Sequence, residues 1–136
     1  MIFDDNLKRA VSDVARRHGL SLVAAFGSIV AGTAGQESDV DIAVKFRNGD
    51  AGLRRILEVQ RDLSELFGDR KVDLSVINRA DPLFMKKIAE RCLFLYEETG
   101  EGDAFLLLAF KRYHDHGKYL KMERDFAIDY VNRIAP

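Results

Sequence analysis

The sequence lacks several features that mark secreted, zinc-binding or membrane proteins. Its 136 residues contain one cysteine, Cys92, which cannot form an internal disulfide and lies in an apolar run, as a reduced core residue would. No Cys/His cluster is present to favour zinc. No apolar stretch approaches membrane-spanning length, and the first five residues lack the charged-then-apolar pattern of a signal peptide. Together these features predict a cytoplasmic protein that makes no membrane contact.

The chain also has no excess of charge of either sign. The 21 basic and 22 acidic residues are spread along the chain and leave a net charge of −1. Because no dense basic stripe is present, we expect no strong binding to a nucleic-acid backbone. The hydrophobic content of 47% and the length of 136 residues suit one globular domain over residues 1–136.

Apolar periodicity predicts an α/β fold with a small sheet and helices packed on it. Gly19 and Gly68 are typical helix stops, and Asp81 before Pro82 is a typical helix start. The pattern predicts helices over 5–18, 53–67 and 82–90, and strands over 21–27, 40–46, 71–77 and 92–96. The expected core face of the second helix consists of Leu53, Ile56, Leu57, Leu63 and Leu66.

The C-terminal segment, about 103–134, reads as helical but irregular. Residues 105–110 are apolar on every side, so we expect them to be buried on several faces. This surface either wraps the sheet or faces a partner chain. Gly117 is expected to break or bend the helix. His114 and His116 are two residues apart and diverge on a helix, which argues against a metal site there.

Paired carboxylates mark the start of the second predicted strand. Asp39 and Asp41 alternate with Val40, so both side chains project to the same face, about 7 Å apart along the strand. Such a pair repels itself unless a cation lies between, and Mg²⁺ prefers a few carboxylates together with phosphate oxygens and water. Asp73, in the otherwise apolar strand 71–77, is a third acid that needs a partner or an ion if it is buried.

A small turn precedes these acids. The apolar run 23–26 ends at Gly27, and Ser28 opens the next segment. A glycine lets backbone N–H groups approach a phosphate closely, and the serine hydroxyl adds a donor. If Ser28 begins a short helix, the helix dipole also favours the anion. Gly32 and Gly35 leave the following loop free to fold over a nucleotide.

The composite pattern resembles a known signature. Phe26-Gly27-Ser28, followed by Ser38-Asp39-Val40-Asp41 and the apolar run 42–44, resembles the polymerase-β-type nucleotidyltransferase superfamily. The length and the ending, with Val72-Asp73-Leu74 and then 88–96, resemble its smallest members, the minimal nucleotidyltransferases. These include MntA-type antitoxins paired with HEPN-domain toxins. The resemblance covers roughly residues 7–97.

The resemblance implies roles residue by residue. Gly27 and Ser28 would contact the triphosphate, and Asp39 and Asp41 would ligate Mg²⁺. Asp73 would be the third carboxylate, a metal ligand or the group that activates an acceptor hydroxyl. AMP would pass from ATP to a tyrosine of a cognate HEPN toxin, which would make the chain an antitoxin, and the sheet would be mixed. Many relatives carry an arginine three residues after the serine, where this chain has Ala31.

Two other functions stay open. An antibiotic-modifying, small-molecule nucleotidyltransferase usually needs a second domain, and only 40 residues follow Tyr96. A homo-oligomer with an inter-subunit cleft would supply the missing wall. The other alternative is a non-catalytic module that neutralises a toxin by contact alone, as the missing arginine at Ala31 would allow.

Overall fold

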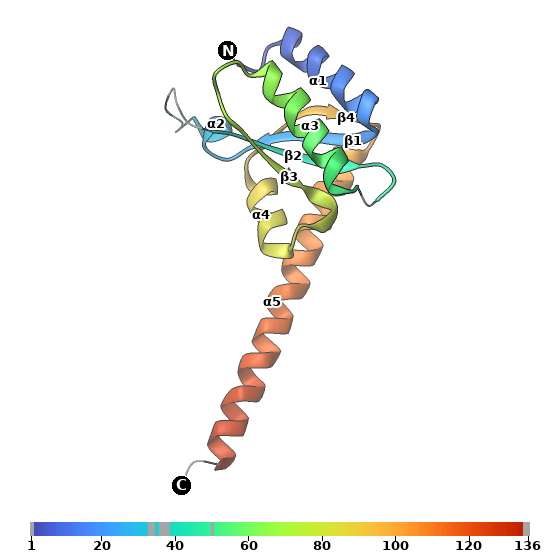
Figure 1. Cartoon of the computed structure of the whole chain (residues 1–136). Helices are drawn as coiled ribbons and strands as arrows, with labels where there is room; N and C mark the ends of the chain where they lie inside the picture. The colour runs from blue at the N-terminus through green and yellow to red at the C-terminus, as the bar shows by residue number, and fades with distance from the viewer. Residues whose placement is uncertain (1, 33–34, 36–38, 50, 135–136) are drawn as a thin grey trace.

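The computed structural model describes residues 2–32, 35, 39–49 and 51–134. Four strands form one sheet in the order β3-β2-β1-β4 (Figure 1). The strands are β1 (Leu20–Phe26), β2 (Val40–Phe46), β3 (Val72–Val76) and β4 (Cys92–Glu97). β1 runs antiparallel to both β2 and β4, whereas β2 and β3 are parallel. The sheet is therefore mixed, which confirms the expected fold class.

The helices lie where the sequence predicts them, with bounds shifted by a residue or two. They are α1 (Asp5–His18), the single turn α2 (Ser28–Ala31), α3 (Leu53–Leu66), α4 (Pro82–Glu90) and α5 (Glu101–Ile134). α1 ends because Gly19 adopts a left-handed conformation, with φ at 67°. α4 begins because the Asp81 side chain accepts a hydrogen bond from the Phe84 amide, 2.8 Å away.

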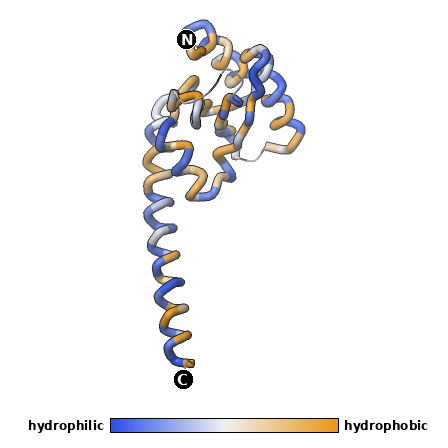
Figure 2. The backbone as a smooth tube through the Cα atoms, turned by 90° about the vertical axis from the view of Figure 1, so that its left-hand side faces the viewer, coloured by the Kyte–Doolittle hydropathy of each residue, from blue (hydrophilic) through white to orange (hydrophobic). Residues whose placement is uncertain are grey.

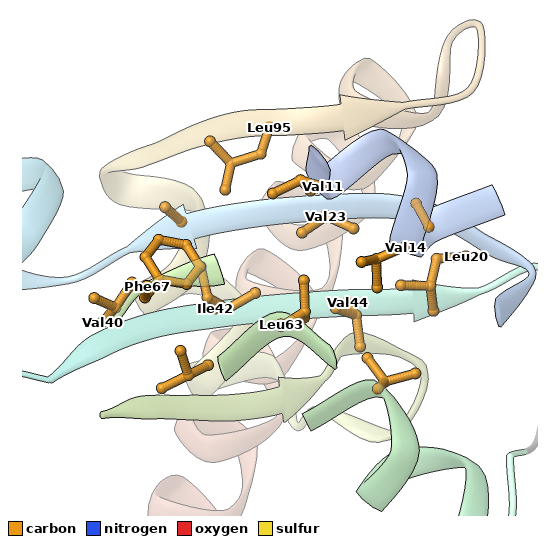
Figure 3. Packing of buried hydrophobic residues seen from close by; sticks show 14 of the residues in the cluster. Val11, Val14, Leu20, Val23, Val40, Ile42, Val44, Leu63, Phe67 and Leu95 are labelled. Carbon is orange, nitrogen blue, oxygen red and sulfur yellow. The ribbon is translucent and has the colours of Figure 1, made fainter. Parts of the chain in front are cut away.

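The two faces of the sheet carry separate apolar clusters. On one face, α1 and α3 pack on alternate residues of β1 and β2, including Val23, Ile42 and Val44 (Figure 3). On the other face, α4 and the start of α5 cover Leu22 and Ala43. β1 is buried at every position because it lies inside the sheet and is covered on both faces. Strand alternation thus places Asp41, one position from Ile42 and two from Ala43, on the α4 face.

The core face of α3 differs from expectation. Leu53 is 71% exposed and Leu57 is 57% exposed, whereas Val59 is fully buried. The observed stripe is Ile56, Val59, Leu63 and Leu66, at spacings of three and four residues. Leu53 and Leu57 fall outside it because the docking of α3 on the sheet turns them toward solvent. Their assignment to the core was wrong.

α5 differs most from expectation. It is one uninterrupted helix of 34 residues, so of the predicted break or bend at Gly117, the break is wrong. One glycine costs about 1 kcal/mol in a helix, which a long helix can absorb. Residues 105–110 are buried on one face only, through Phe105 and Ala109, while Leu107 and Phe110 are exposed. After the contacts of Arg112 and Tyr113 with α4, the helix leaves the body of the protein instead of wrapping the sheet (Figure 1). No helix within the described ranges combines the length and apolarity needed to cross a membrane.

Candidate active site

The turn after β1 requires glycine for two reasons. Gly27 has φ 75° and ψ −152°, a backbone conformation that is essentially restricted to glycine. In addition, a β-carbon at position 27 would lie 3.3 Å from Cγ of Asp41 and would overlap its Oδ2 atom. The Gly27 carbonyl accepts the amides of Val30 and Ala31, at 3.2 and 3.0 Å, which closes the single turn of α2. Because α2 is only four residues long, its dipole contributes little.

Strand register brings two of the predicted acids together. Asp41 pairs with Asp73 across the parallel β2–β3 ladder, and neighbouring strands lie about 4.8 Å apart. Across the antiparallel β1–β2 ladder, Asp41 pairs with Phe26, the residue that precedes Gly27. The fold therefore places Gly27, Asp41 and Asp73 side by side at one end of the sheet, although they are distant in sequence.

Asp41 is at the electrostatic centre of this group. Its side chain is half-buried, whereas Asp39 and Asp73 are exposed. Burial raises the pKa of Asp41 above its ordinary value, and the negative charge of Asp73 raises it further. The cation of Lys87 opposes this rise, and the charge of Asp39 adds a smaller increase. All three predicted acids thus interact through Asp41.

The position of Asp73 corrects one argument from the sequence. An acid flanked by Val72 and Leu74 was expected to need a partner or an ion if it was buried. Instead, β3 is an edge strand and Asp73 is exposed, so water can solvate its carboxylate. What distinguishes Asp73 is its register opposite Asp41. Its predicted role in catalysis is therefore supported by proximity and not by burial.

The acids do not form a complete metal cage by themselves. In the part of the chain that the structure describes, no three His, Cys, Asp or Glu side chains are arranged to hold a metal ion. Mg²⁺ usually takes one or two protein carboxylates and fills its octahedron with phosphate oxygens and water. A divalent cation beside Asp41 would also relieve the repulsion from Asp73 and Asp39. The residues present therefore fit a magnesium ion that is completed by a nucleotide.

Lys87 is a cation near the acids that the sequence did not single out. It is exposed on α4, one turn beyond Phe84, whose ring packs edge-on against Phe26 with centroids 6.0 Å apart. That contact holds α4 beside the end of β1, and the charge of Lys87 acts on Asp41. Lys87 and Phe84 line a cavity of 540 Å³ at the α4–α5 junction, with His116 on its other side. Only the packing of α4 distinguishes Lys87 from a solvated lysine.

Other basic residues have structural partners. Lys86 pairs with Glu90 at 2.8 Å, and Arg54 pairs with Glu58 at 3.5 Å. Arg55 donates a hydrogen bond to the His18 carbonyl at 2.6 Å.

The structure says less about the other residues of the predicted nucleotide-binding turn and loop. Ser28 and Ala31 are half-buried in α2, and Gly32 ends that helix in a left-handed conformation. Ser38 lies outside the described residues, as does most of the loop that was expected to fold over a nucleotide.

Comparison with known proteins agrees with this geometry. A Methanocaldococcus jannaschii protein, provisionally named a protein adenylyltransferase, is 29% identical over 84 residues, which span 62% of this chain and 88% of that protein. A chain from a toxin–antitoxin crystal structure with AMP-PNP shares the fold with a TM-score of 0.70 and 24% identity, covering 91% of this chain and 97% of the other. A chain from the complex of a tri-AMPylated Shewanella oneidensis HEPN toxin with an MNT antitoxin has a TM-score of 0.65 and 21% identity, covering 93% of this chain and 96% of the other.

A sequence family provides the decisive match. The family described as "Polymerase beta, Nucleotidyltransferase" matches residues 10–101, which contain Gly27, Asp41 and Asp73. The matched region begins within α1 and ends at the first residue of α5. Because this match spans more than half of the chain, the chain belongs to the polymerase beta nucleotidyltransferase family.

Proposed function

We propose that this protein is a metal-dependent nucleotidyltransferase that transfers AMP from ATP to a tyrosine hydroxyl of a HEPN toxin and thereby acts as an antitoxin. Membership of the nucleotidyltransferase family supports the reaction class. The naming of one relative as a protein adenylyltransferase, and the AMPylated HEPN toxin in one structural neighbour, support AMP and a protein acceptor. AMP-PNP in another neighbour supports ATP as the donor.

The observation that carries the proposal is the contact between Gly27 and Asp41, with Asp73 in register beside them. A glycine turn that binds the triphosphate is expected next to the acids that would hold Mg²⁺, because this ion takes carboxylate and phosphate oxygens together. Here the fold requires glycine at position 27 partly because the Asp41 carboxylate occupies the space of a side chain. A structural turn alone would not need a carboxylate there.

In the proposed mechanism, the Gly27 backbone and the Ser28 hydroxyl bind the triphosphate of ATP. Asp39 and Asp41 would hold Mg²⁺, which supplies charge stabilisation to the attacking and leaving oxygens when bound. Asp73 orients the acceptor hydroxyl and takes its proton. The bond from that oxygen to the α-phosphorus forms as the bond to pyrophosphate breaks. Lys87 supplies a cation beside Asp41, in a chain that has Ala31 where many relatives carry arginine.

Intact-mass spectrometry tests this function. The purified chain would be incubated with Mg-ATP and the product of the neighbouring gene, as the candidate HEPN-type acceptor. We expect the partner to gain one or more AMP units with the wild type and none with Asp39→Asn/Asp41→Asn. Asp69→Asn, which removes a carboxylate from an exposed position, is the matched control and should transfer normally. Transfer by the double variant would refute the assigned site.

The other functions predict different outcomes of the same experiment. A stable complex without any mass gain would assign the protein as a non-catalytic antitoxin. Absence of both complex and mass gain, together with AMP transfer to an aminoglycoside-type hydroxyl compound, would assign the small-molecule reaction. That reaction would also require a cleft between two subunits. Light scattering on the isolated chain would then give the mass of a dimer.

A further inference from the structure

Among the described residues, the last part of α5 contacts the body only near its start, where Arg112 donates a hydrogen bond to Met85 Sδ at 3.6 Å and Lys86 lies over the Tyr113 ring. We call residues 111–134 the arm. Every side chain of the arm is exposed except that of His116, which is half-buried. At 1.5 Å per residue, the arm extends about 35 Å away from the body (Figure 1). Isolated helices of this length are marginal in water, and most protein helices depend on packing of an apolar face.

The arm nevertheless carries a large apolar surface. Met122 is 70% exposed and Phe126 is 74% exposed, and apolar residues recur to the end of the helix (Figure 2). The large exposed apolar residues of its second half are Tyr119, Leu120, Met122, Phe126, Ile128, Tyr130, Val131 and Ile134. Contiguous exposure on this scale marks an interaction site in a soluble protein.

These residues are organised on the helix. Tyr119, Met122, Phe126 and Tyr130 are spaced by three or four residues and so form one stripe. A second stripe contains Leu120, Val131 and Ile134. The opposite side is polar, with Lys118, Lys121, Asp125, Asp129 and Asn132. Glu123 and Arg133 interrupt the apolar side, which is otherwise suited to bind another helix along its length.

The arm is continuous with the candidate active site. Two adjoining cavities, of 540 and 460 Å³, share Leu83 and His116 as lining residues. The first contains Lys87, whose charge acts on Asp41. The second continues along α5 to Leu120 and Lys121. Of the two stripes, the one through Leu120 borders the second cavity, so a chain bound along Leu120, Val131 and Ile134 would reach the α4–α5 junction beside Lys87.

Charge favours an acidic partner at this junction. Lys87 lines the first cavity, and Lys118 and Lys121 line the second. Asp81 is the one acid among the residues that line these two cavities. An apolar helix with acidic flanks would complement this surface, and charge complementarity sets orientation and partner choice. A second copy of the chain would instead bring the same lysines toward its own basic segment if paired in parallel.

The structural neighbours provide a second argument for a different protein as the occupant. The match to the complex containing AMP-PNP leaves less than a tenth of this chain uncovered, which is shorter than the arm. Part of the arm therefore has a counterpart in chains that were crystallised as members of toxin–antitoxin complexes.

We propose that the apolar face of the arm and the groove at the α4–α5 junction form the docking surface for the protein acceptor, which lays an apolar helix with acidic flanks along α5. This inference rests on the proposed function, because docking there would present an acceptor hydroxyl near Asp73. The arm would then set the apparent affinity for the acceptor and leave the chemical step unchanged.

Two single substitutions on the arm test the proposal. Phe126→Glu adds one negative charge on the apolar face, and Asn132→Glu adds the same charge on the polar face. Binding of the product of the neighbouring gene, as the candidate HEPN-type acceptor, would be measured by calorimetry, with helicity checked by circular dichroism. We expect Phe126→Glu to weaken the Kd at least tenfold and Asn132→Glu to change it less than about twofold. In AMP transfer, Phe126→Glu should raise KM for the partner and preserve kcat.

Each other outcome has a defined meaning. Equal binding by both variants, or no complex with the wild type, would overturn the docking proposal. A wild-type dimer in light scattering that Phe126→Glu converts to monomer would also overturn it, since a second copy would then cover the arm. A complex that Phe126→Glu disrupts but in which no AMP is transferred would support the docking surface and refute the transferase function. The two proposals can therefore fail separately.

Discussion

The carboxylate of Asp41 lies directly against the α-carbon of Gly27, where any other residue would place its β-carbon. This contact joins the turn after β1 to the first acid of β2. It leaves no room for a side chain at position 27. The predicted phosphate turn and the predicted metal ligand therefore lie against each other.

Gly27→Ala should impair both stability and activity. The backbone conformation at Gly27 is essentially restricted to glycine, so we expect a loss of about 1–3 kcal/mol in unfolding free energy. The added β-carbon must also displace the Asp41 carboxylate, and misplacing a catalytic group by about 1 Å can cost about 100-fold in rate. Denaturant titration and AMP-transfer rates would measure the two effects.

Gly32→Ala is the matched control for this substitution. Gly32 also has positive φ, at 78°, but nothing lies within 4 Å of an added β-carbon. It should lose about 1–2 kcal/mol of stability and transfer AMP at close to the normal rate. Equal losses of activity in both variants would attribute the defect to backbone strain and not to Asp41.

Asp41→Asn should not destabilise the protein at neutral pH. The pKa of Asp41 is raised in the folded state, so folding becomes less favourable as pH rises from 3.8 through that pKa. Asparagine removes this penalty, and we expect equal or higher stability above that window and no difference below pH 3.8. Thermal unfolding across pH would show it.

Magnesium should stabilise the wild type but not the Asp41→Asn variant. Mg²⁺ relieves the repulsion at Asp41, so it should raise the Tm of the wild type and leave that of Asp41→Asn unchanged. Asp69→Asn should respond to Mg²⁺ like the wild type. An equal rise in all three proteins would place the ion elsewhere.

Asp62→Asn should weaken the contact between α1 and α3. The Asp62 carboxylate accepts hydrogen bonds from His18 Nε2 at 2.6 Å and from Arg17 at 3.2 Å. The bond from His18 lowers the pKa of Asp62, so its contribution to stability is present above the ordinary pKa of 3.8 and is lost as pH falls through the lowered value. We expect a loss of about 1 kcal/mol at neutral pH.

Asp13→Asn provides the comparison for this ion pair. Asp13 lies 3.9 Å from Arg16, and both side chains are about 70% exposed. Removing that surface pair should change stability by a few tenths of a kcal/mol. Chemical denaturation at pH 7 would compare the two variants, and equal effects would show that the His18–Asp62 bond contributes nothing specific.

Two glycines of α5 should respond in opposite directions to alanine. Nothing lies within 4 Å of an added β-carbon at Gly117, so Gly117→Ala should favour the helix by about 1 kcal/mol. At Gly102 the added atom would lie 2.7 Å from the Phe94 ring and would overlap Glu97, which should cost about 1–3 kcal/mol. Thermal melts followed by circular dichroism would measure both. A loss of helicity in Gly117→Ala would contradict the continuous helix.

Local patterns accounted for most of the secondary structure. Gly19 and the Asp81–Pro82 pair fix helix ends through backbone geometry and a side-chain hydrogen bond that involve only neighbouring residues. The core face of α3 could not be read in the same way. Leu53 and Leu57 are apolar and at helical spacing, but the rotation of a docked helix depends on the sheet beneath it.

The sequence by itself determined the chemistry that is present: a glycine turn, an Asp-x-Asp pair whose side chains share a face, and a third acid in a later strand. Only the tertiary structure decided how they meet. The parallel register of β2 and β3 places Asp73 beside Asp41, and the packing of Phe84 on Phe26 brings Lys87 close to Asp41. The exposure of the arm was also decided at this level, because whether an apolar helix is covered depends on what lies around it. Spacing along a chain fixes which side chains share a face, whereas strand register and helix docking fix which faces come together.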